Sequence, residues 1–155
     1  MRRLTSFAAA VSLSIIPATA FAQGSPLATA FRDNASEVGK HLIAAAEVMP
    51  ADKFAFKPTP AQMSYGDIVV HLIQGNDFLC AAIGGMKAPA RTKIAATDAK
   101  VTLVTRLRET FQFCDQSLAG LDDSKLTDQL PMFGGKTMTR AAVEVFDGGR
   151  LGRSL

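Results

Sequence analysis

The sequence predicts an all-α protein: a four-helix bundle in which the fourth helix is truncated. Three long segments carry apolar residues at mostly three- and four-residue steps, the spacing that gives a helix one apolar face. Prolines, capping residues and glycine pairs mark the ends of these segments. A fourth segment of this kind lasts only about two turns, so three long helices would lack a fourth partner of similar length.

The first predicted helix runs from Leu27 to Met49 and has a proline at each end. Pro26 lies near its start, where the missing amide donor costs little, and Pro50 lies just beyond its last turn. Polar residues separate the apolar ones throughout this segment. Both boundaries of a long amphipathic helix are therefore marked in the sequence.

The second predicted helix covers residues 65–83. It follows a connector, residues 51–63, in which two prolines favour extended backbone. Ser64 followed at the third position by Asp67 is a variant of the capping box that begins many helices, and Gly84-Gly85 is typical of a helix end.

The third predicted helix carries an apolar stripe from Val101 to Leu121 and follows a connector of about 15 residues. Such a connector can run the full length of a helix, so the second and third helices can be parallel. Cys80 and Cys114 lie at the same height along the two helices only if the helices run parallel. In that arrangement they either form a disulfide or remain two buried thiols. Two cysteines are too few for a disulfide framework and too far apart for a CxxC site.

The fourth predicted helix begins at Arg140, with Thr139 as its cap, and Gly148-Gly149 stops it. Residues 125–138 before it are expected to be irregular, because they hold a proline and a glycine pair. So short a helix would leave the apolar stripes of its neighbours exposed. We therefore expect a second copy of the chain, as a homodimer, to be one candidate partner.

The first 22 residues have the plan of a secretory signal peptide. Arg2 and Arg3 precede an apolar run that is about half the length of a membrane span, and Ala20-Phe21-Ala22 supplies small residues for cleavage. We expect cleavage after Ala22, an exported mature chain of residues 23–155 in the periplasm or outside the cell, and no stable membrane anchor. The alternative is an uncleaved anchor helix.

Two of the three net positive charges of the whole chain lie in this segment. Its removal takes away two of the 17 basic residues and none of the 14 acidic ones, so the mature chain is almost neutral. The remaining lysines and arginines are scattered without aromatic residues between them. Nucleic acid is therefore not an expected partner, and a small-molecule substrate or ligand is.

Several blocks in the first half of the mature chain resemble the DinB-like family of helical-bundle proteins. These blocks are Ala46-Glu47-Val48-Met49-Pro50, Phe54-Ala55-Phe56-Lys57-Pro58-Thr59-Pro60, Ser64-Tyr65-Gly66-Asp67 and Val70-His71-Leu72. The resemblance continues more weakly and covers roughly residues 27–146. It implies a four-helix bundle in up-down-down-up order, with three histidines around one divalent metal, Zn²⁺ or Ni²⁺.

His71 matches the first metal ligand of that family, on the second helix. The resemblance implies two further histidines on the fourth helix, usually four residues apart, and they are missing here. His41, the other histidine of the chain, lies outside the ligand positions and is expected at the surface. Glu144 and Asp147 could reach a metal from the short fourth helix. The metal site is therefore expected to be incomplete, with no metal in this chain as the alternative.

The last seven residues, 149–155, suggest a reason for the missing histidines. Read one base later, their codons can encode Asp, any residue, Trp, Ala, Asp, His and Tyr in that order, which resembles the fourth helix of family members. We therefore expect this tail to be a frameshift product. Three functions stay open: a metal-dependent hydrolase or transferase, a non-catalytic bundle that binds a small ligand or a partner, and an inactive remnant. Whether the chain is an enzyme is left open.

Overall fold

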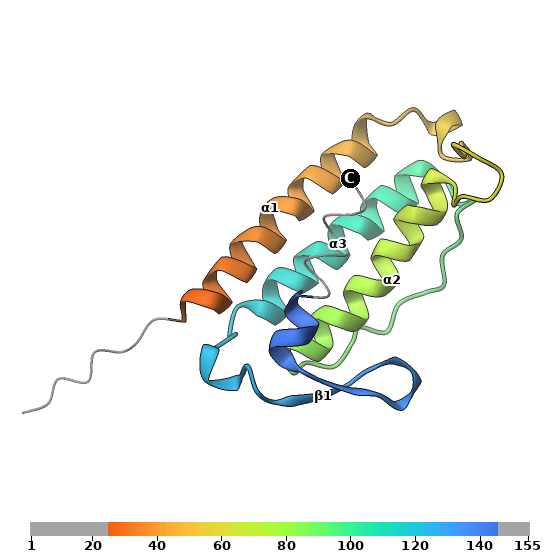
Figure 1. Cartoon of the computed structure of the whole chain (residues 1–155). Helices are drawn as coiled ribbons and strands as arrows, with labels where there is room; N and C mark the ends of the chain where they lie inside the picture. Colours follow the sequence, from red (N-terminus) through yellow and green to blue (C-terminus); the bar gives the residue numbers. More distant parts are fainter. Residues whose placement is uncertain (1–24, 146–155) are drawn as a thin grey trace, which may run out of the picture.

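A computed structural model of the chain describes residues 25–145. Three long helices form its body: α1 (Pro26–Val48), α2 (Tyr65–Gly84) and α3 (Lys100–Leu118). α2 and α3 run in the same direction and α1 runs opposite to both (Figure 1). The predictions of a mainly helical fold and of parallel second and third helices are thus confirmed. None of the helices in the described range is long and apolar enough to cross a membrane.

Shorter elements connect and follow these helices. They are the 3₁₀ turns η1 (Ala51–Lys53), η2 (Asp123–Lys125) and η3 (Phe133–Gly135), the strands β1 (Gln129–Pro131) and β2 (Thr137–Thr139), and a helical segment over residues 140–145. The two strands pair antiparallel, with Leu130 opposite Met138. The expectation of irregular structure over residues 125–138 was therefore wrong. Strands of three residues are too short to show an alternating pattern in the sequence.

The local caps that the sequence predicts at two helices are present. The Ser64 hydroxyl accepts a hydrogen bond from the Asp67 amide, and the Asp67 carboxylate accepts one from the Ser64 amide. The Ser64 side chain and amide lower the pKa of Asp67, because they hydrogen-bond its charged form. The Thr139 hydroxyl likewise accepts from the Ala142 amide, as expected for the cap of the helix that begins at Arg140.

Two long-range contacts cap α1 and α3 where they lie side by side. Asp123 accepts hydrogen bonds from the first free amides of α1, those of Leu27 at 3.1 Å and Ala28 at 2.8 Å. In return, Arg32 of α1 donates to backbone carbonyls just after α3, among them that of Leu121. α3 ends at Leu118 instead of Leu121, and Leu121 stays buried without helical backbone. The segment that follows α3 thus caps the start of α1, and α1 in turn supplies hydrogen-bond donors to that segment.

α2 and α3 make the closest helix pair. Cys80 and Cys114 form the disulfide that the sequence allowed, with their Cα atoms 5.1 Å apart. Because the bridge closes a stretch of 34 residues, it stabilises the fold by about 3–4 kcal/mol in the loop-entropy model. One turn further on, Gly84 lies against the backbone of Ser117, so a Cβ atom added there would lie 2.2 Å from the Ser117 carbonyl oxygen.

The crossover from α2 to α3, residues 85–99, runs back along the length of both helices (Figure 1). Arg91 holds the crossover against both helices, since its guanidinium pairs with Asp77 of α2 at 2.6 Å and with Glu109 of α3 at 3.1 Å. Asp77 also accepts a hydrogen bond from the buried hydroxyl of Thr110. The crossover is therefore fixed to both helices that it connects.

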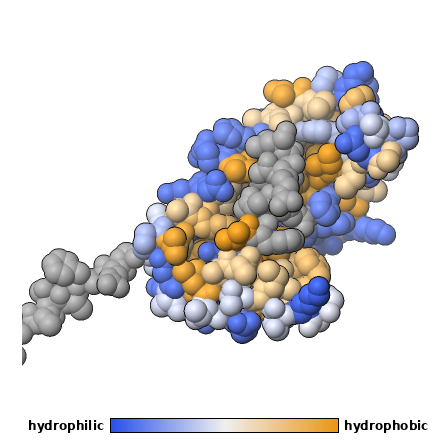
Figure 2. Space-filling model, in the orientation of Figure 1, coloured by the Kyte–Doolittle hydropathy of each residue, from blue (hydrophilic) through white to orange (hydrophobic). Residues whose placement is uncertain are grey.

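Apolar side chains pack into two clusters at the two ends of the body. Phe54 and Leu107 belong to the cluster around the start of α3, and Leu79 and Val143 belong to the cluster around the disulfide. On the face shown in Figure 2, hydrophobic residues are visible inward of the mainly hydrophilic edges.

Two groups of sequence predictions lie outside the described residues. The signal peptide falls in residues 1–24, and both the end of the fourth helix and the frameshift hypothesis fall in residues 146–155. The four-helix, up-down-down-up bundle therefore stays a prediction beyond residue 145.

The contact at Gly84 gives a test of the α2–α3 packing. Gly84→Ala should lower the free energy of unfolding by about 1–3 kcal/mol, because the new methyl group meets backbone that cannot move independently. Gly120→Ala is the matched control, since a Cβ there meets nothing within 4 Å and should change stability by no more than about 0.5 kcal/mol. Urea unfolding of both variants measures the difference. Equal effects would contradict the close approach of the two helices.

Candidate functional site

His71, the predicted metal ligand, lies on the exposed side of α2. Its neighbours Leu72 and Ile73 are buried, so the helix turns its apolar face inward at this point and leaves the imidazole at the surface. A histidine at this position could bind a metal only together with donor side chains from another element of the chain. Whether His71 binds a metal stays a prediction.

His41 lies on α1, where the imidazole is 3.3 Å from the Glu37 carboxylate. Its side chain is 62% exposed, which confirms the surface position expected from the sequence.

The acidic candidates do not complete a metal site around His71 in the described part of the chain. Glu144 is 6% exposed, and burial raises its pKa while the charge of Arg140 opposes this shift. Asp147 lies outside the described residues. Both cysteines are held in the disulfide. Among residues 25–145 no three His, Cys, Asp or Glu side chains come together as a metal would require.

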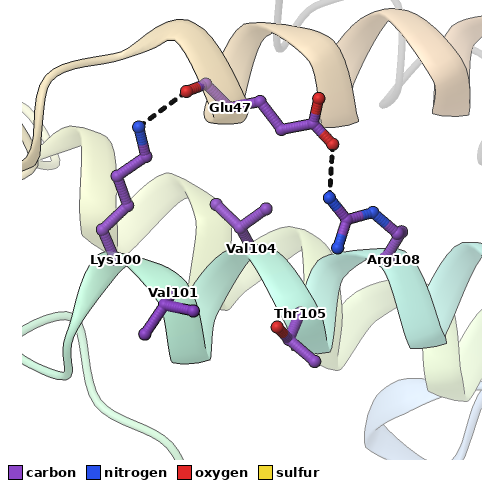
Figure 3. Close-up of a pocket in the computed structure, with 6 residues that line it drawn as sticks. All are labelled: Glu47, Lys100, Val101, Val104, Thr105 and Arg108. Carbon is purple, nitrogen blue, oxygen red and sulfur yellow. Dashed lines mark hydrogen bonds and ion pairs between the residues drawn. The ribbon is translucent and has the colours of Figure 1, made fainter.

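A different feature has the form of a binding site: an open groove between the end of α1 and the start of α3. We call it the α1–α3 groove, and its lining residues are Glu47, Lys100, Val101, Val104, Thr105 and Arg108 (Figure 3). Its volume is about 400 Å³, which is within the usual range for small-molecule sites. Five of the six residues come from one face of α3, at helical spacing.

Glu47 spans the groove from the α1 side, above Val104 (Figure 3). Its backbone carbonyl accepts a hydrogen bond from Lys100 Nζ at 2.6 Å, and its carboxylate accepts one from Arg108 Nη2 at 2.5 Å. The two cations are eight residues apart on α3, or about 12 Å at the rise of an α-helix. Valine therefore forms the middle of the groove, and charged groups stand at both of its ends.

A second, smaller hollow adjoins this groove at Arg108. Phe111 and Ile43 are among its lining residues, and so are Lys40 and Asp115. Burial raises the pKa of Asp115, and the charge of Lys40 opposes the shift. Next to Arg108, the surface therefore consists of apolar side chains and two opposite charges, those of Lys40 and Asp115.

The sequence pattern did not point to this groove. Val101 was expected in the apolar stripe of the third helix, yet it is 71% exposed, whereas Val104 in the same stripe is 7% exposed. The reason is that α1 covers the side of α3 on which Val104 lies but leaves Val101 at the rim. The two cations Lys100 and Arg108, at the edge of the apolar stripe, were the only feature in the sequence that could have indicated the groove. Their partner Glu47 is more than 50 residues away in the chain, so local patterns do not connect it with them.

The fold and its sites define a small helical protein with a ligand-sized groove and a surface histidine on its second helix. A comparison with protein families matches residues 35–146 to the DinB superfamily. Since this match covers most of the chain, the protein belongs to the DinB superfamily. A comparison with curated proteins finds no match.

Proposed function

We propose that this DinB-superfamily protein is an exported, non-catalytic binding protein that holds a small molecule in the α1–α3 groove. The observation that carries the proposal is the groove itself, in which apolar side chains lie between two cations and a carboxylate. Small-molecule sites typically combine an apolar lining with a few polar groups that orient the ligand. Among residues 25–145, the lining comes from the end of α1 and the start of α3.

Export rests on the signal-like segment of residues 1–22 and is supported by the buried disulfide, because disulfides persist in oxidising compartments such as the periplasm. Expression of the full chain in a bacterial host should therefore give a periplasmic protein that begins at Gln23. Mass spectrometry of the periplasmic fraction measures the start of the chain. An uncleaved chain in the membrane fraction would favour the anchor-helix alternative.

Binding in the groove is tested by NMR titration of the mature chain with two alkyl probes, octanol and octanoate. We expect at least one probe to shift the amide signals of α3 near Val101 and Val104. Val101→Asn should weaken this binding about fivefold to tenfold, because it removes apolar contact area at the rim.

Thr102→Asn is the matched control for that variant. It changes an exposed residue in the same turn of α3 that does not line the groove, so it should leave the affinity unchanged. If neither probe binds to the folded chain, the small-ligand function is wrong. A chain that fails to fold or to stay soluble would favour the inactive remnant instead.

A metal-dependent hydrolase or transferase is the second candidate, favoured by the exposed position of His71 in a DinB-superfamily chain. It requires donors beyond residue 145, because the described residues do not fit a three-ligand site. On this candidate, the mature chain should retain about one Zn²⁺ or Ni²⁺ after dialysis and lose it on His71→Ala, but not on the control His41→Ala. Elemental analysis measures the content. Metal-free protein that stays folded would exclude this candidate.

A further inference from the structure

The charges of the α1–α3 groove do not cancel. Lys100 and Arg108 supply two positive charges, and Glu47 supplies one negative charge, which pairs with Arg108. The Lys100 ammonium donates to a neutral carbonyl of Glu47, and within residues 25–145 no carboxylate pairs with it. Among the residues that the structure describes, one positive charge is therefore uncompensated at the end of the groove where α3 begins.

The surface between the charged ends is apolar and partly exposed. Val101 is 71% exposed at the rim, and Val104 is 7% exposed beneath Glu47. Covering such side chains removes apolar area from water, which stabilises a bound alkyl or aryl group.

These observations together specify an occupant with one negative charge and an apolar body. We propose that the α1–α3 groove selects amphipathic monocarboxylates, with the carboxylate at Lys100 and the apolar body over Val101 and Val104. This proposal rests on the small-ligand function above and names the class of ligand. A carboxylate can also accept from Arg108, since a guanidinium has five N–H donors and one of them bonds Glu47. A cationic ligand would be repelled by the uncompensated charge of Lys100.

The test compares octanoate with octanol, which share an alkyl chain and differ in the charged group. Dissociation constants are measured by NMR titration of the mature chain at low salt. Octanoate should bind about tenfold more tightly than octanol, as expected for a charge-assisted hydrogen bond at a partly exposed site. Lys100→Gln should abolish this difference by weakening octanoate binding, and the dispersed amide spectrum recorded in the same titration shows whether the variant is folded.

Lys93→Gln is the matched control, because Lys93 is an exposed lysine of the crossover that does not line the groove. It should preserve the tenfold preference. In the unsubstituted chain, raising the salt concentration should weaken octanoate and not octanol, since salt screens exposed charges.

Equal affinities for the two probes, or a preference that survives Lys100→Gln, would overturn the carboxylate assignment and leave the small-ligand function intact. Absence of binding by both probes would overturn the function and the assignment together. The two failures are therefore distinguishable in one set of titrations.

Discussion

The parallel pairing of α2 and α3 is the constraint on which the rest of the structure depends. Parallel neighbours cannot be joined by a short turn, so the chain must return along the whole length of the pair, and residues 85–99 do so. The Cys80–Cys114 disulfide and the close approach at Gly84 fix the pair from within. Arg91 then holds the returning segment against both helices through Asp77 and Glu109.

α1 is attached to this pair mainly through α3, and the contacts at its two ends differ in kind. At its start, Asp123 and Arg32 complete the backbone hydrogen bonding of the helix ends, and such contacts leave little room between the helices. In its middle, Gly39 lies against the ring of Phe111, where a Cβ atom would come within 2.7 Å. At its end, Ala46 is buried in the same apolar cluster as Val104, and the long side chains of Lys100 and Arg108 reach Glu47. The α1–α3 groove lies at this end, where Glu47 accepts hydrogen bonds from two side chains of α3.

The sequence predicted correctly those features that depend on residues close together in the chain. The spans of the three helices, the caps at Ser64 and Thr139, and the exposed His41 follow from residues within a few positions of one another. The disulfide could also be anticipated, because the crossover length and the positions of the cysteines constrain each other.

What the sequence could not supply depends on contacts between distant segments. The cap on α1 comes from Asp123, more than 90 residues away, and a local search for caps near Ser25 does not find it. Val101 fits the apolar stripe of α3 as well as Val104 does, and only the path of α1 decides that one is exposed and the other buried. The strands of the hairpin are shorter than any pattern that could reveal them.

The two candidate sites depend on different parts of the chain, and this separates the functions that they support. Within residues 25–145, the groove is formed by α1 and α3. A metal site at His71 would need donors that residues 25–145 do not provide, whatever follows them. Since residues 23–155 are also nearly neutral overall, selection of an anion by the groove must come from the local imbalance at Lys100 and not from the general field of that part of the chain. A single lysine substitution is therefore a sharper probe of this groove than any change in net charge elsewhere.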